Sequence, residues 1–232
     1  MIQHLTFSLL FLCCFSMVAL AVTESVVYFT PPAGWQMADP SQLPPCVKWM
    51  VVGKGPSFFP PSLNLSTEPY KGSMKAFLKR VRQADEERGY LWKDLGTLRT
   101  DAGVGSLIQV DIPSEWGEKR SMQLILLKNG QLYILNATSL KEEFPLFYKE
   151  FFAAMRSLRI LKDPIEMLPL PNDRAALRKE IEALQSACQK DPVCKQEEWK
   201  RFQEWVKNTF PCMSQEWRKL VLQEVEPTLV SS

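Results

Sequence analysis

Histidine is almost absent from this chain. The only one among 232 residues is His4, inside an apolar stretch at the N-terminus. Outside that stretch the chain therefore cannot build a Ser-His-Asp triad, a Cys-His nucleophile pair or a zinc site with histidine ligands. The cysteines also lack the paired Cys-x-x-Cys spacing typical of cysteine zinc sites. These absences favour a protein that is not an enzyme and that uses no metal or cofactor.

Phosphate-binding motifs and excess charge are missing as well. The glycines of Gly53-Lys54-Gly55 and Gly103-Val104-Gly105 lack the spacing and the strand-to-helix context of nucleotide-binding loops. The net charge is only +2, and basic residues alternate with acidic ones. We therefore expect no nucleic-acid partner.

The first 21 residues contain no Lys, Arg, Asp or Glu. This apolar run ends in Ala19-Leu20-Ala21, a small-x-small pattern that predicts a signal peptide cleaved before Val22. Export to the periplasm or beyond the cell would follow. The alternative is an uncleaved N-terminal membrane anchor, because the run approaches spanning length and lacks a basic start.

Export favours disulfides for the cysteines that follow the signal peptide. Cys188 and Cys194 flank the turn between two expected helices, so we favour their pairing. Cys46 and Cys212 form a weaker second pair that would tie the C-terminal segment to the main domain. Four cysteines allow three pairings, and spacing alone does not choose among them.

The strongest structural signal is a β-hairpin within residues 122–136. Asn129-Gly130 fits a type I′ turn and has apolar runs on both sides. A helix is expected after Lys141, with one apolar face made by these residues: Phe144, Phe147, Tyr148, Phe151, Phe152, Met155 and Leu158. Both hairpin strands carry apolar residues at both alternating positions, so we expect both faces of the sheet to be covered.

Further strands are expected at residues 26–30, 47–52, 62–67, 95–99 and 107–112, with a loop at 101–105. A helix capped by Ser73 should bury Met74, Phe77, Leu78, Val81 and Ala84. Trp35 is expected to fill an edge of the core. This order predicts an α+β fold: an antiparallel sheet with helices on both faces, an α/β/α sandwich, over residues 22–161.

The pattern changes after Leu161. Three prolines within residues 162–172 predict an extended linker. Residues 173–232 then predict a small helical segment. Trp199, Trp205 and Trp217 lie on helix faces with aliphatic residues, which indicates a small core rather than a ligand cage.

Several patterns in the main domain resemble the PsbP-like family, the PsbP/DcrB-type α/β/α sandwich. Phe29-Thr-Pro-Pro-Ala-Gly-Trp35 is similar to its opening strand and turn, and Pro60–Ser66 is similar to one of its early strands. Ser73–Val81 resembles its first helix, and Tyr133–Thr138 with Phe147–Leu158 resembles its closing strand and helix. The resemblance implies a non-catalytic, exported module that docks on larger assemblies.

The leading hypothesis is therefore a binding module that docks on a protein complex of the envelope or lumen. Its partner-facing surface is expected to be the sheet edge, the helix at residues 75–88 or the C-terminal tail. The helix offers these residues as candidates: Lys75, Lys79, Arg82 and Glu86. One alternative is a membrane-anchored structural protein that retains residues 1–21. Another is a hydrolase that uses carboxylates, whose candidates are Asp85, Glu86, Glu87, Asp111, Glu142 and Glu143. Neighbouring residues of a helix point apart, so these acidic runs do not predict a converging pair.

Overall fold

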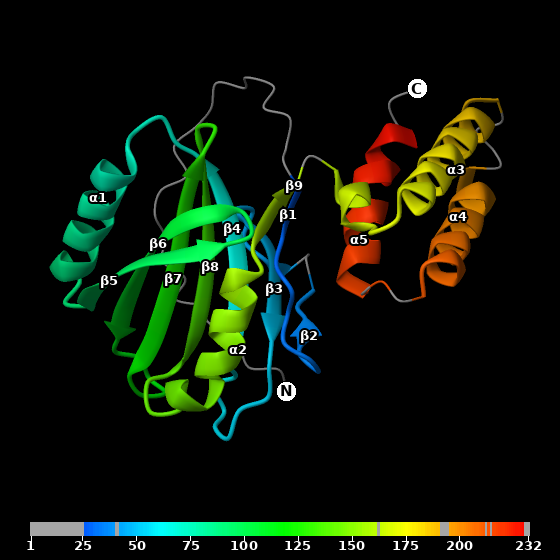
Figure 1. Ribbon diagram of the computed structural model, residues 1–232. Coiled ribbons are helices and arrows are strands. Elements are labelled where there is room, and N and C mark those ends of the chain that lie inside the picture. The colour runs from blue at the N-terminus through cyan, green and yellow to red at the C-terminus, as the bar shows by residue number, and fades with distance from the viewer. Residues whose placement is uncertain are drawn as a thin grey trace.

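The computed structural model describes residues 26–39, 42–161, 163–190, 195–211, 213 and 215–229 (Figure 1). The strands are β1 (Val26–Tyr28), β2 (Gln36–Met37), β3 (Val47–Val52), β4 (Ser62–Pro69), β5 (Leu91–Thr100), β6 (Gly103–Ile112), β7 (Lys119–Lys128), β8 (Gln131–Leu140) and β9 (Arg159–Leu161). The α-helices are α1 (Met74–Glu87), α2 (Phe144–Arg156), α3 (Pro171–Lys190), α4 (Lys195–Thr209) and α5 (Gln215–Val225). Two short 3₁₀ helices are η2 (Pro164–Met167) and η4 (Glu226–Leu229).

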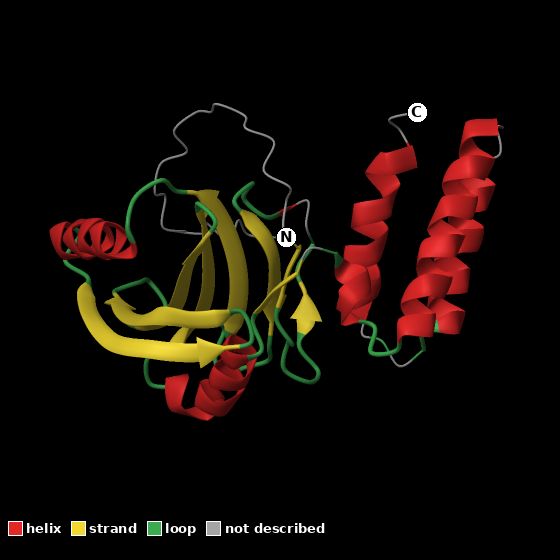
Figure 2. Cartoon of the chain, turned by 45° about the horizontal axis from the view of Figure 1, so that its top comes forward, coloured by secondary structure: helices red, strands yellow, loops and turns green. Residues whose placement is uncertain are grey.

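The main sheet has seven antiparallel strands in the order β2-β3-β4-β8-β7-β6-β5. Helices α1 and α2 lie on opposite sides of it (Figures 1 and 2). Strands β1 and β9 form a separate two-stranded sheet. The predicted α+β fold, an antiparallel sheet with a helix on each face, is confirmed.

The β7–β8 hairpin forms where the sequence predicts it. Asn129 and Gly130 have φ angles of 53° and 75°, the left-handed values that a type I′ turn requires. Lys128 pairs with Gln131 across this turn. Successive β7 residues alternate between the two cores: Leu124 and Leu126 face the α2 side, whereas Ile125 faces the α1 side.

Helix α2 packs its aromatic face on the larger core. Phe151 is fully buried and has the rings of Phe144, Phe147 and Trp35 around it. Trp35 thus fills the edge of this core, as predicted. Tyr148 was predicted to lie on the same apolar face, and this is wrong, because its side chain is 50% exposed. Its ring lies against that of Phe152, with 4.5 Å between the ring centres.

Two elements differ from their predicted extents. The expected loop at 101–105 is only a turn at Asp101-Ala102, and Gly103 through Gly105 belong to β6. A side chain at position 105 would collide with Leu124 and Leu126, since an added Cβ would lie 2.7 Å from each. The glycine therefore serves close packing rather than a loop. The expected extended linker contains η2, and α3 already begins at Pro171.

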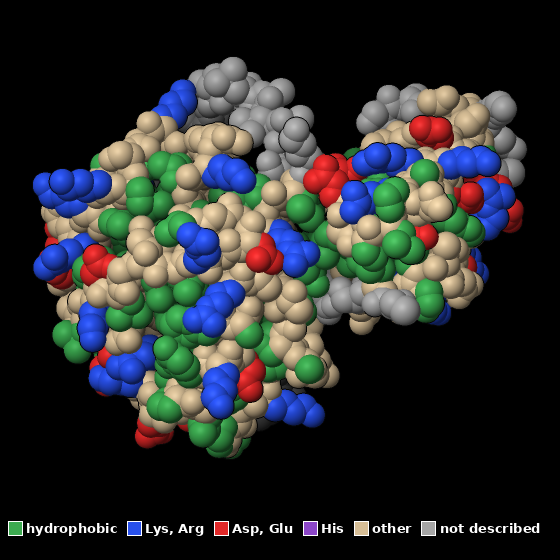
Figure 3. All heavy atoms as spheres, viewed as in Figure 1, with side chains coloured by type: hydrophobic (Ala, Val, Ile, Leu, Met, Phe, Trp, Pro, Cys, Tyr) green, Lys and Arg blue, Asp and Glu red, His purple; other side chains and the backbone are tan. Residues whose placement is uncertain are grey.

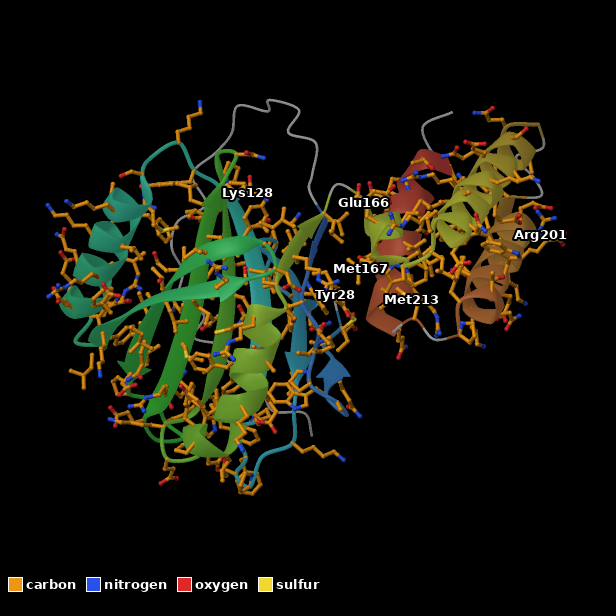
Figure 4. The ribbon with its side chains drawn as sticks, viewed as in Figure 1. Tyr28, Lys128, Glu166, Met167, Arg201 and Met213 are labelled. Atoms are coloured by element: carbon orange, nitrogen blue, oxygen red, sulfur yellow. The ribbon has the colours of Figure 1, made fainter. Side chains whose placement is uncertain are left out.

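The C-terminal helices surround a core of their own. Trp217 is fully buried there, and its indole Nε1 donates a hydrogen bond to the carbonyl oxygen of Pro164 at 2.9 Å. Trp199 and Trp205 pack at the side of this core, as predicted. Met167 contacts both this core and the main one, and Tyr28 lies on the facing side of the main domain (Figure 4).

Some predictions concern residues beyond those described. Cys46 is exposed and Cys188 is buried, and neither is bonded to another cysteine among the described residues. Their expected partners Cys194 and Cys212 lie outside the described residues, as do residues 1–21. Disulfide pairing and signal cleavage therefore stay predictions. Within the described ranges, no helix is long and apolar enough to cross a membrane.

Candidate functional site on helix α1

Helix α1 is fixed on the sheet by its start and by its inner face. The Ser73 hydroxyl accepts a hydrogen bond from the backbone N–H of Ala76, which caps the helix as predicted. Phe77 and Val81, one turn apart, are buried against Ile108 and Val110 of β6 and residues of β7 and β8. The helix is therefore a rigid platform that presents its opposite side to solvent.

The outer side of α1 carries the four predicted partner-facing residues. Lys75, Lys79, Arg82 and Glu86 are all exposed. Arg82 forms an ion pair with Glu86, with 2.7 Å between Nε and Oε1, and its guanidinium lies over the ring of Trp92. Figure 3 shows Lys and Arg side chains projecting over this helix at the left of the molecule.

The two lysines differ from Arg82 in their surroundings. Within the described residues, neither Lys75 nor Lys79 forms an ion pair. Lys71, Arg80 and Arg88, all exposed, add positive charge around them. The only exposed acids on the helix itself are Glu86 and Glu87, and Glu86 is already paired. The outer face of α1 thus carries unneutralised positive charge.

Asp85, on the inner side of α1, is the feature that sequence reasoning missed. Its residue type and acidic neighbours predict a solvated position, yet it is fully buried, and neither carboxylate oxygen has a hydrogen-bond partner in the described structure. Burial raises its pKa to about 6, although the charge of Arg88 opposes this change. The spacing of Phe77, Val81 and Asp85, four residues each, could have placed it on the buried face.

Trp92 of β5 shares this environment. Its indole Nε1 is also buried without a hydrogen-bond partner in the described structure, and Trp92 packs against the same apolar cluster as Phe77 and Val81. The carboxylate of Asp85 has a pKa suited to acid–base chemistry, but it is closed off from solvent. A substrate therefore has no access to it in this arrangement.

Asp111 lies on the other face of the sheet, where its pair partner is Arg120. Arg120 Nε and Nη2 each donate to the Asp111 carboxylate at 2.8 Å, and Lys141 Nζ lies 3.2 Å from it. Burial alone would raise the pKa of Asp111, but the hydrogen bonds and charges of Arg120 and Lys141 outweigh it and lower the pKa. This carboxylate stays ionised and ties β6 and β7 to the chain before α2.

The remaining carboxylate candidates do not complete a catalytic pair with these two. Glu86, Glu87 and Glu142 are exposed, and Glu143 is buried at the start of α2. Asp85 and Asp111 are separated by the sheet. Across the described ranges, no three His, Cys, Asp or Glu side chains gather as a metal site would require.

No family model and no curated protein matches this chain. Similar solved structures include LpqN of Mycobacterium tuberculosis, described as involved in cell envelope biogenesis, with 14% identity, a TM-score of 0.45 and coverage of 59% of this chain and 84% of LpqN. Cyanobacterial PsbP of Synechocystis is similar over 63% of this chain and 98% of its own, with 11% identity and a TM-score of 0.42. A Pseudomonas aeruginosa protein of unknown function, PA94, is similar at 14% identity, with a TM-score of 0.38, over 64% of this chain and 99% of its own. A cyanobacterial PsbP, from the family that the sequence resembles, is thus among the similar structures, at low identity and with a TM-score below 0.5.

Proposed function

We propose that this protein is an exported, non-catalytic binding module that docks on a protein complex of the envelope or lumen through the outer face of α1. The observation that carries the proposal is the pair of exposed lysines, Lys75 and Lys79, on a helix whose inner face is anchored to the sheet. Because the helix backbone is held on the sheet, the two charges are presented from fixed positions and little backbone freedom is lost on docking. The partner surface that complements it is acidic.

Charge reversal at the two lysines should separate docking from folding. The double variant Lys75→Glu, Lys79→Glu is expected to weaken partner association about tenfold or more, because it replaces two attractions by two repulsions at one surface. Its thermal unfolding should stay close to that of the wild type, since exposed substitutions change stability little. Association is measured as the amount of partner that copurifies from the protein's own cells at low salt.

The matched control is Lys149→Glu, Lys179→Glu. These lysines are also exposed, lie on α2 and α3, and form no ion pair within the described residues. The total change in charge is the same. Loss of partner in the first double variant but not in the second supports the proposal. Equal loss in both variants would point to net charge alone and would rule out α1 as the docking face.

A further inference from the structure

A patch of uncharged polar side chains occupies the centre of the main sheet, beside α1. It lies on strands β4, β8 and β7, the three middle strands of the seven. One row across the three strands consists of side-chain amides: Asn64, Asn136 and Gln123. The row next to it consists of hydroxyls: Ser62, Thr138 and Ser121. Each row is in direct cross-strand register, which places its side chains next to one another on one face.

This amide–hydroxyl patch continues the face on which α1 sits. Gln123 pairs with Ile108 and Ser121 pairs with Val110, and both of these β6 residues belong to the apolar cluster beneath α1. Among the described residues, that cluster includes members of β6, β7 and β8 but none of β4. One sheet face is therefore apolar under α1 and changes to amides and hydroxyls toward β4.

A relay of hydrogen bonds holds the patch in a defined orientation. Gln123 Nε2 donates to Ser121 Oγ at 3.5 Å, and the Ser121 hydroxyl donates to Asn136 Oδ1. Because the oxygen of the Asn136 amide is engaged by Ser121, its NH₂ group is directed away from Ser121. Asn136 is thereby fixed as a donor next to Asn64, its partner on β4.

The β4 side of the patch has unused hydrogen-bonding groups. Ser62 is 94% buried, yet in the described part of the chain no hydrogen bond to its hydroxyl is formed. The side chains of Asn64 and Thr138, both half-buried, also lack a hydrogen-bond partner there. These side chains are not among the fully buried polar groups that lack partners in the described structure, so their donors and acceptors still reach solvent and are available side by side to a ligand.

Aromatic rings border this patch at one end. Lys119 precedes Ser121 by two residues on β7, and its Nζ lies 5.5 Å from the ring centre of Phe59. The Phe59 ring in turn contacts Trp116, with 5.7 Å between ring centres. Phe58 is fully exposed, and Trp116 is 37% exposed. Flat apolar surfaces thus stand next to the donors and acceptors.

We infer that this face binds a neutral oligosaccharide. Sugar hydroxyls both donate and accept, as the amides of Asn64 and Asn136 and the hydroxyls of Ser62 and Thr138 do. The C–H face of a sugar ring is apolar and suits an aromatic ring such as Trp116. A charged ligand is disfavoured, because Lys119 interacts electrostatically with the carboxylate of Glu115, so the two charges at this end oppose each other. The site is separate from the outer face of α1, so it does not depend on the docking proposal.

The same asparagines match the glycosylation pattern, as Asn64-Leu-Ser66 and Asn136-Ala-Thr138. Both lie in the middle of central strands, and Asn136 is held by Ser121. Glycan acceptors occupy accessible surface loops, so this placement disfavours glycosylation at either asparagine.

The test uses the side-chain amide signals of the ¹⁵N-labelled protein in NMR spectra. The probes are maltohexaose, cellohexaose and N-acetylchitohexaose at up to about 10 mM, which exceeds a weak millimolar Kd. At least one is expected to shift the NH₂ signals of Asn64 and Asn136 and the indole signal of Trp116. Asn64→Ala should weaken that binding about tenfold or more, because Asn64 loses its contacts with the ligand while no hydrogen bond within the described protein is lost.

Asn172→Ala is the matched control, since Asn172 is an exposed asparagine on α3, and it should bind the sugar like the wild type. A second variant, Trp116→Ala, checks the aromatic border and should also weaken binding. The inference is overturned if none of the three sugars shifts these signals, or if Asn64→Ala binds as the wild type does. An extended neutral peptide that shifts the same signals in place of the sugars would overturn it as well.

Discussion

Phe151→Asp is expected to unfold the main domain. The wild-type side chain is fully buried among the rings of Trp35, Phe144 and Phe147. Removing such a ring costs about 3–5 kcal/mol, and an unpaired carboxylate in its place adds a desolvation penalty. Together these approach the total stability of about 5–15 kcal/mol of a typical domain. Circular dichroism during heating should show no cooperative transition for this variant.

Tyr148→Asp on the same helix is the control for this prediction. Its side chain is 50% exposed, so the new carboxylate stays in water and unfolding should remain cooperative. A soluble Phe151→Asp protein that melts cooperatively near the wild-type temperature would contradict the packing of α2 described here.

Asp85→Asn is expected to stabilise the protein at neutral pH. The pKa of Asp85 is raised from 3.8 to about 6 in the folded state, mainly because burial disfavours the charged form. The folded state therefore binds this proton more tightly than the unfolded state does. The contribution of Asp85 to stability is therefore most favourable below about pH 4, falls as the pH rises through the folded pKa, and then levels off. A pKa difference of about two between the folded and unfolded states corresponds to about 3 kcal/mol at pH 7, which is the upper limit of the gain from a neutral amide.

The measurement is urea unfolding of wild type and Asp85→Asn at several pH values between about 4 and 8, a range that spans the unfolded and folded pKa values of Asp85. The two proteins should differ most at neutral pH and above, and the difference should shrink in acid. Glu87→Gln serves as control, because Glu87 is an exposed carboxylate on the same helix and its removal should leave the pH dependence in place. A parallel pH dependence in wild type and Asp85→Asn would show that Asp85 is not buried without a partner.

The local parts of the fold could be predicted because their causes are local. Asn129-Gly130 determines its own turn, and the Ser73 cap with Phe77 and Val81 determines α1. Strand order was not predictable in this way. β4 inserts between β3 and β8 although many residues separate it from β8, and β9 pairs with β1 across almost the whole domain. Such pairings depend on the packing of the complete chain.

The site could be predicted only in part, for a related reason. Lys75 and Lys79 are exposed because helical periodicity alone directs them outward. The residue type of Asp85 favours the surface, whereas its position on the helix buries it. The amide–hydroxyl patch depends on the register that aligns Asn64 with Asn136 and Asn136 with Gln123, which no single strand reveals.

Native mass spectrometry of the protein, purified gently from its own cells, tests the central claim most directly. The proposed function predicts a mature chain that begins at Val22 and travels with a protein partner in fixed stoichiometry. That partner should be lost from the Lys75→Glu, Lys79→Glu variant and retained by the Lys149→Glu, Lys179→Glu control. A wild-type chain that travels alone under these conditions would contradict a docking function.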